Sequence, residues 1–321
     1  MKGLDPKPAT LSSGDPVLVE VKIIDTTPDP FSGKMGSYIL VSPDGEAAMI
    51  DSGPKTSWSR VGEEIRSMGV RLKYVILTHI HLDHASAAGS IVRSLETVEA
   101  VFVHPRGARH MADPERLWQA SKQFLGDYAD FFGKPEPVPE NKIVVPGDGE
   151  VLELFEGVRL HVIYTPGHAS HHMSFYLPEG NIMFTGDSAG VSLQDDDGTL
   201  IEFPTTPPPF KPVEYVNSLE AMARFRPERL AFAHYGVRGE GMEYLRWHRE
   251  DIIRWIREAV EYVSRGGGDA EELMRLLADK LENAGKAYRA KNPIISEFMY
   301  RGTILGLLDT AIRGEWKRLH F

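Results

Sequence analysis

Three histidines and one aspartate occupy six consecutive positions, 79–84, in the segment THIHLDHA at 78–85. Neutral imidazoles and a carboxylate are costly to bury unless a charge or a metal ion pairs with them. The chain has no cysteine, which excludes disulfides, thiolate metal sites and a cysteine nucleophile. The cluster therefore predicts a metal site built from nitrogen and oxygen donors, with the ligands His79, His81, Asp83 and His84.

Four ligands on so short a loop must point in different directions, so we expect two divalent metal ions rather than one. Three further candidates follow apolar segments and have a glycine beside them or two residues away: His168 in TPGH, Asp187 in FTGD and His234 in AHYG. Glycine permits the tight turn that aims such a side chain into a site. Nitrogen and oxygen donors favour Zn²⁺, with Fe or Mn as alternatives.

The elements around these residues follow from the apolar pattern. A buried strand is expected over 73–77 and a helix over 84–95, so the histidine cluster lies on a strand-to-helix loop, where catalytic groups tend to gather. The amphipathic spacing of 58–69 predicts a helix that ends at Gly69. Other strands are expected at 17–24, 36–42, 47–53, 98–105, 142–147, 151–168, 173–180, 181–188 and 229–236. Other helices are expected at 112–135, 212–225 and from about 240 onward, with breaks at 266–268 and 283–286.

The motifs IDSG, THIHLDHA, TPGHASHH, FTGDS and AHYG occur in that order between residues 17 and 236. This set resembles the metallo-β-lactamase superfamily. The resemblance implies an α/β fold, a four-layer αβ/βα sandwich with the metals at one edge of its two sheets. It also implies a catalytic domain over 1–238, with a helical insertion at about 112–135, and a C-terminal helical extension over 239–321.

The resemblance assigns roles to the candidate ligands. It implies that His79, His81 and His168 hold one metal, that Asp83, His84 and His234 hold the other, that Asp187 bridges them, and that Asp51 supports the ligands from behind. Two cations about 3.5–4 Å apart lower the pKa of a bridging water to near 7 and so supply hydroxide. We expect this hydroxide to cleave a small ester, thioester or lactone. Asp83 would orient it and shuttle its proton, and Tyr235 would either face the oxyanion or simply pack.

The motifs and the helical extension are most similar to the glyoxalase II branch of the superfamily. Two alternatives are a phosphodiesterase or nuclease with the same dinuclear site and a persulfide dioxygenase with a single iron. The net charge of −10 argues against a nucleic-acid partner, and the lack of cysteine argues against the dioxygenase. The candidates for a substrate pocket are His104, His172, Phe203 and Phe210, whereas His248 fits a packing role on an apolar helix stripe.

The remaining expectations concern partners and location. The first 17 residues contain no apolar run typical of a signal peptide, and no later stretch approaches 18 apolar residues. We therefore expect a cytoplasmic protein that acts on a small molecule and has no membrane partner. The long apolar-striped helix expected over 292–313 favours a homodimer.

Overall fold

The computed structural model describes residues 19–319. The described chain divides into two compact units, an N-terminal unit of residues up to 162 with 177–182 and a C-terminal unit of 163–176 with 183 onward. Residues 1–18 lie outside the described residues. They include positions 17 and 18 of the first expected strand and the N-terminal segment in which no signal peptide was expected. The predicted domain boundary at residue 238 stays a prediction.

The N-terminal unit contains a sheet of six strands in the order β1-β2-β3-β4-β5-β6. The first three strands pair antiparallel, and β3 to β6 pair parallel. The parallel part places the ends of β3 and β4 at one edge of the sheet, so the segments that follow these strands lie near each other. The strands are β1 (Glu20–Asp25), β2 (Gly36–Val41), β3 (Glu46–Ile50), β4 (Arg71–Ile76), β5 (Ala100–Phe102) and β6 (Ile143–Val144).

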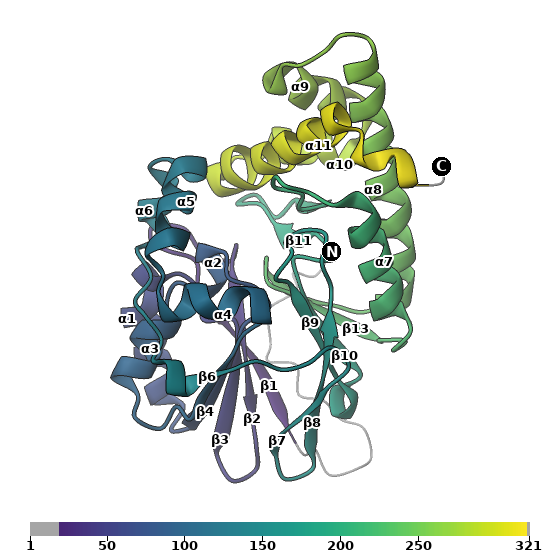
Figure 1. Ribbon diagram of the computed structural model, residues 1–321. Helices are drawn as coiled ribbons and strands as arrows, with labels where there is room; N and C mark the ends of the chain where they lie inside the picture. The colour runs from purple at the N-terminus through teal and green to yellow at the C-terminus, as the bar shows by residue number, and fades with distance from the viewer. Residues whose placement is uncertain (1–18, 320–321) are drawn as a thin grey trace. The chain divides into compact units, whose positions relative to one another are not determined.

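Helices α1 (Trp58–Ser67), α3 (Ala88–Ser94) and α4 (Pro105–Ala112) lie beside this sheet (Figure 1). Their apolar side chains and those of the strands form one buried cluster, whose members include Val61, Ile65, Ile91, Met111, Ile39, Met49 and Val75. Burial of this apolar surface is the main force that holds the helices to the sheet. The core thereby fixes the loop after β4, which carries the histidine cluster.

The helix expected over 84–95 is in fact two short helices, α2 (Leu82–Ala85) and α3. The helix is interrupted at Ala87, whose N–H donates to the Gly53 carbonyl instead of to the carbonyl four residues earlier. The Ser86 hydroxyl also donates to the Phe132 carbonyl at this break. The helical character expected over 112–135 is confirmed by α5 (Glu115–Leu125) and α6 (Tyr128–Phe132).

A second sheet has the strand order β14-β13-β10-β9-β8-β7. The single strand expected over 151–168 is a hairpin of β7 and β8, because Gly157 adopts a φ of 74° and turns the chain. The sequence did not predict the separate β11–β12 hairpin, whose strands flank the polar segment 195–198. The strands are β7 (Val151–Phe155), β8 (Val158–Tyr164), β9 (Met173–Leu177), β10 (Ile182–Gly186), β11 (Val191–Gln194), β12 (Leu200–Phe203), β13 (Arg229–Phe232) and β14 (Gly236–Arg238).

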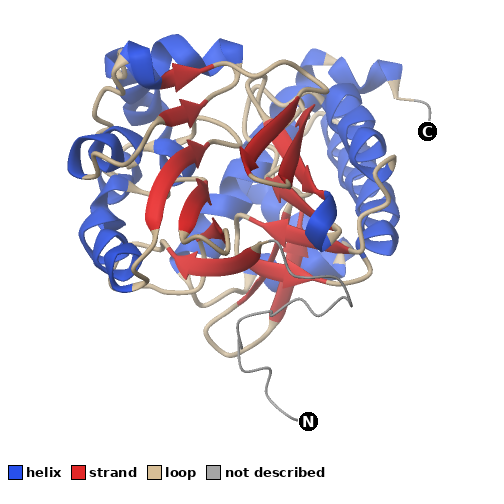
Figure 2. Ribbon diagram, turned by 90° about the horizontal axis from the view of Figure 1, so that it is seen from below, coloured by secondary structure: helices blue, strands red, loops and turns tan. Residues whose placement is uncertain are grey.

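The C-terminal unit ends in a helical region, as predicted, and Figure 2 shows its helices beside the strands. The expected break at 266–268 is confirmed, whereas the break expected at 283–286 is wrong because α10 runs through it. The helices are α7 (Pro212–Ala223), α8 (Gly241–Ser264), α9 (Ala270–Lys280), α10 (Glu282–Tyr288), a π-helix (Ile294–Tyr300) and α11 (Arg301–Arg313). Short 3-10 turns occur at Lys55–Ser57, Glu140–Lys142, Pro178–Gly180 and Glu315–Arg318.

His248 on α8 is a packing histidine, as predicted. Its ring stacks on Tyr244, and its Nε2 lies 2.9 Å from the Tyr215 hydroxyl. Complete burial lowers the pKa of His248 to about 3, so the ring is neutral at physiological pH. Among residues 19–319, no helix has the length and hydropathy that crossing a bilayer requires.

Candidate metal centre

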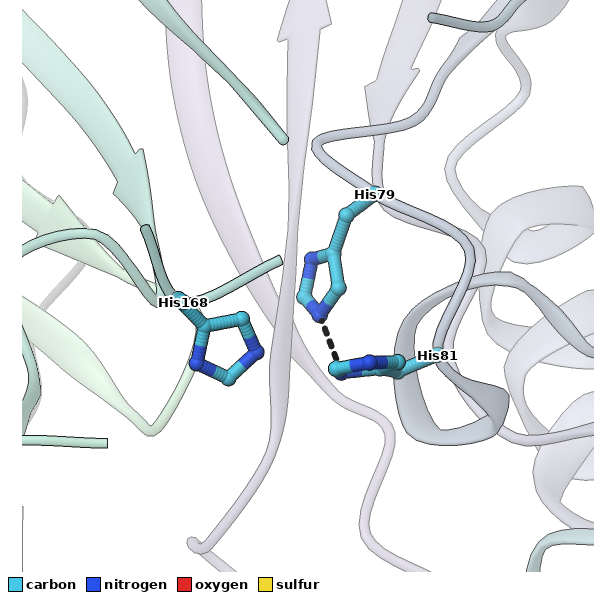
Figure 3. A group of neighbouring side chains, drawn as sticks. All are labelled: His79, His81 and His168. Atoms are coloured by element: carbon cyan, nitrogen blue, oxygen red, sulfur yellow. Dashed lines mark hydrogen bonds between the residues drawn. The ribbon is translucent and has the colours of Figure 1, made fainter. Parts of the chain in front are cut away.

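The histidine cluster lies between the end of β4 at Ile76 and helix α2, as predicted. Nε2 of His79 and Nδ1 of His81 are 2.9 Å apart (Figure 3), and Nε2 of His84 is 3.5 Å from Oδ2 of Asp83. Two donors that each lie about 2.1 Å from one zinc ion are about 3.0–3.4 Å apart for angles between right-angled and tetrahedral. Both pairs therefore have about the separation that ligands of one metal ion have.

Asp51 supports two of these histidines within the N-terminal unit. Its Oδ2 lies 3.0 Å from Nδ1 of His84, and both of its oxygens accept the Thr78 hydroxyl. Because that hydroxyl has only one proton, it accepts from Nδ1 of His79, which is 3.0 Å away. Both histidines thus have Nδ1 engaged and Nε2 left as the donor atom for a metal, which is the usual arrangement of metal-binding histidine.

Asp51 reaches this position through an uncommon backbone conformation. It follows β3 with a φ of 58°, in the left-handed region that aspartate tolerates better than most residues. Its Oδ1 also accepts the Thr78 N–H at 2.7 Å, at the start of the histidine loop. One buried carboxylate therefore connects the segment after β3 with the loop after β4.

The C-terminal unit brings together His168, Asp187 and His234. Oδ2 of Asp187 lies 3.3 Å from Nε2 of His168, and its Oδ1 lies 3.5 Å from Nε2 of His234. The three side chains are almost completely buried. Each carboxylate oxygen therefore faces a different histidine, at about the separation expected of two ligands on one metal.

The TPGH turn that carries His168 is anchored on α7. The Ser218 hydroxyl donates to the Pro166 carbonyl at 2.7 Å, and the Lys211 N–H donates to the Gly167 carbonyl at 3.0 Å. Gly167 has a φ of 133°, and a Cβ at this position would lie 2.4 Å from the Cα of Tyr215. Only glycine allows the turn to approach the helix so closely.

Asp187 is held by hydrogen bonds to both sides of its backbone. Its N–H donates to Nε2 of His172 at 3.0 Å, and its carbonyl accepts the Thr205 hydroxyl at 2.8 Å. Because Nε2 of His172 accepts, its Nδ1 carries the proton and donates to the hydroxyls of Thr165 and Ser188, at 2.8 and 2.9 Å. His172 was expected in the substrate pocket, but it is fully buried behind Asp187.

The candidate ligands of the described chain fall into two sets: His79, His81, Asp83 and His84 in the N-terminal unit, and His168, Asp187 and His234 in the C-terminal unit. They are the residues that the resemblance implies as ligands. All donors are nitrogen or oxygen, so the side chains suit zinc, iron or manganese.

A comparison with models of protein families shows to which family the chain belongs. The model of the metallo-beta-lactamase superfamily matches residues 32–234, which is more than half of the chain and includes every candidate ligand. The chain belongs to this superfamily. Its members bind metal ions and are generally hydrolytic, which agrees with the histidine and aspartate groups described above.

Relatives within the superfamily support the assignment. The metallo-beta-lactamase fold-containing protein ST1585 of Sulfurisphaera tokodaii is 30% identical over 210 residues, covering 64% of this chain and 75% of that protein. The crystal structure of ST1585 matches with a TM-score of 0.61 and 27% identity, over 73% of this chain and 86% of that one. The structure of TTHA1429 from Thermus thermophilus shares the fold, with a TM-score of 0.61, 22% identity, and coverage of 92% and 94%.

A further relative has a named activity. The atrochrysone carboxyl ACP thioesterase of Aspergillus fumigatus is 26% identical over 170 residues. The match covers 52% of this chain and 44% of that protein, so the chain matches less than half the length of this relative.

Three of the other expected site residues have structural roles in this superfamily member. Nδ1 of His104 accepts the Arg106 N–H and caps α4, and burial, with Arg106 nearby, lowers its pKa to about 4. Phe203 packs against Trp255, and Phe210 packs against Tyr215. Both phenylalanines are fully buried, so substrate contact would require this core to open.

Tyr235, expected to face the oxyanion, is half-buried directly after His234. The sequence analysis missed two residues that support the site, Thr78 and Thr205. Thr78 immediately precedes His79, and this adjacency was a signal that could have revealed it. Thr205 gave no such signal, because its partners lie far away in the sequence.

Proposed function

We propose that the protein is a dinuclear metal-dependent hydrolase that cleaves a small ester, thioester or lactone. The observation that carries this proposal is the geometry of Asp187, whose two oxygens face Nε2 of His168 and Nε2 of His234 at 3.3 and 3.5 Å. A carboxylate in this position can bridge two metal ions, one on each oxygen. The remaining donors of each ion would come from His79, His81, Asp83 and His84.

Two bound divalent cations would lower the pKa of a water that they share and polarise the oxygen of the scissile carbonyl. Asp83, which is buried beside His84, would orient the attacking water and accept its proton. Tyr235 would donate its phenol proton in a hydrogen bond to the oxygen that gains negative charge. Asp51 would keep the rings of His79 and His84 oriented through Nδ1 during turnover.

Within this group of substrates, a thioester has the most support, because relatives of this chain are named ACP thioesterases. The glyoxalase II-like and lactonase-like activities belong to the same proposal. We also propose a cytoplasmic location, a small-molecule substrate without nucleic-acid or membrane partners, and a homodimeric assembly.

The test is hydrolysis by the zinc-loaded protein of a panel that contains an acyl thioester, an aryl ester, a lactone and a phosphodiester. We expect turnover of at least one of the first three substrates and much slower turnover of the phosphodiester. Mutation of a residue that supports a metal ligand typically lowers activity by up to about 100-fold. The variant Asp187→Ala should lose more activity than this, because it removes a donor to both ions.

The matched control is His110→Ala, which removes a histidine of α4 that belongs to none of the metal-ligand groups. It should keep wild-type activity. Wild-type turnover by Asp187→Ala would contradict the proposed bridge. Faster cleavage of the phosphodiester than of every carbonyl substrate would favour the phosphodiesterase alternative.

A further inference from the structure

The segment 204–210 runs from β12 to α7 and is fixed to the C-terminal helix α11. The Thr303 hydroxyl donates to the Pro204 carbonyl, and the Thr206 hydroxyl donates to the Thr303 carbonyl, both at 2.9 Å. At Gly306 the contact is closer still, since a Cβ there would lie 1.5 Å from the Thr206 carbonyl oxygen. Helix α11 therefore holds the backbone on both sides of residue 205.

Thr205 connects this fixed segment to two candidate metal ligands. Its hydroxyl donates to the Asp187 carbonyl at 2.8 Å, and its own carbonyl accepts Nδ1–H of His168 at 3.0 Å. Only 5% of its surface is exposed, so water does not compete strongly for these hydrogen bonds.

We propose that Thr205 is a positioning residue for His168 and Asp187, and that α11 holds Thr205 in place. The proposal rests on the proposed function to the extent that both ligands bind metal. The bond from Nδ1 fixes the rotation of the His168 ring and leaves Nε2 to face the metal. The bond to the Asp187 carbonyl fixes the peptide plane that follows the aspartate, and with it the direction of the side chain.

This inference gives the C-terminal helices a role in the metal site. The hydrogen bonds of Thr303 join residues 97 and 99 positions apart, so the extension holds a segment of the catalytic region from a distance in sequence. Thr206 and Thr303 are almost completely buried, which makes these bonds persistent. Loosening α11 should therefore weaken metal binding even though α11 provides none of the candidate ligands.

The first test compares Thr205→Val with Thr205→Ser. Valine keeps the branched shape and removes the hydroxyl, whereas serine restores the donor. Zinc affinity is measured by competition with a chromogenic chelator, and the geometry of the site is followed in the visible spectrum of the cobalt-substituted protein. We expect Thr205→Val to weaken zinc binding by about 10–100-fold and to change the cobalt spectrum, because it loosens the aspartate that is proposed to bridge both ions. Thr205→Ser should remain near wild type.

The control is Thr97→Val, which removes a hydroxyl-to-carbonyl bond of the same length at an exposed threonine of the N-terminal unit, from the Thr97 hydroxyl to the Leu72 carbonyl at 2.8 Å. It should leave metal affinity and the cobalt spectrum unchanged. The contrary result is that Thr205→Val leaves metal affinity unchanged and lowers the unfolding temperature of the metal-free protein by no more than Thr97→Val does. Thr205 would then have a purely structural role, and the proposal would be overturned.

A second variant, Thr303→Val, tests the part played by α11 and leaves Thr205 intact. We expect a smaller loss of metal affinity in the same direction, and wild-type affinity would overturn the role assigned to α11. These outcomes are distinct from failure of the proposed function. If the wild-type chain binds two metals but hydrolyses no carbonyl substrate, the proposed function fails and the positioning role of Thr205 is unaffected. If the wild-type chain binds no metal, both proposals are overturned.

Discussion

The two groups of candidate ligands are supported in different ways. In the N-terminal unit the ligands lie within one loop, 79–84, and the side chain of Asp51 orients two of them. In the C-terminal unit the ligands come from three separate segments, and their supports include backbone groups of Asp187 and Thr205. The first group depends on a local motif and one carboxylate, whereas the second depends on how distant segments pack.

Among the variants that test this contrast between the two ligand groups, Asp51→Asn is expected to have the largest effect on metal binding. Asparagine tolerates the left-handed backbone at this position, so the change affects the side chain alone. The His84 Nδ1–H and the Thr78 N–H donate to different oxygens of the carboxylate. An amide has only one oxygen, so one of these donors would face an NH2 group, and the support of both histidines would be disturbed. We expect about 10–100-fold weaker metal binding, measured by chelator competition.

The control is Asp44→Asn, which changes an exposed aspartate in the turn between β2 and β3 of the same unit. It should bind metal as wild type does. If Asp51→Asn also retained wild-type affinity, the N-terminal ligands would not depend on a single carboxylate, and the contrast with the C-terminal group would fail.

A smaller effect, on stability rather than on metal binding alone, is expected from Gly167→Ala. Alanine is strained at a φ of 133° and would clash with Tyr215, so the TPGH turn must shift away from α7. The backbone strain costs about 1–3 kcal/mol of unfolding free energy, and the clash adds to it. Urea unfolding of the metal-free protein measures the loss.

Gly33→Ala provides the comparison, because Gly33 also has a positive φ, of 65°, but has open space where the Cβ would lie. Its cost should reflect backbone strain alone and be clearly smaller. Equal losses in the two variants would show that close packing against α7 does not hold the His168 turn.

The contrast between the two ligand groups also explains what the sequence could predict. The histidine loop and its place after β4 were predictable because the ligands, the preceding strand and the following helix are contiguous in the chain. Asp187 and His234 were predictable because each follows an apolar strand and has a glycine beside it or two residues away. Thr205 was not predictable, since it bonds to residues 18 and 37 positions away, and only packing brings them together.

Contacts between residues that are distant in the sequence also explain where the predictions were wrong. The β11–β12 hairpin was missed because its connecting segment is fixed by tertiary contacts, in which Asp195 accepts the backbone N–H groups of Lys291 and Asn292. Phe203 and Phe210 were expected near the substrate because they belong to a stiff, apolar, proline-rich run that follows the Asp187 strand end. The structure instead buries both among aromatic side chains of the C-terminal unit.

The most direct test of the central claim is elemental analysis of the purified protein, with the amount and identity of metal measured per chain. The account predicts close to two zinc, manganese or iron ions per chain, because Asp187 offers one oxygen beside each of two histidines. A single ion per chain that stays single after reconstitution with excess metal would contradict the dinuclear site and favour the mononuclear iron alternative.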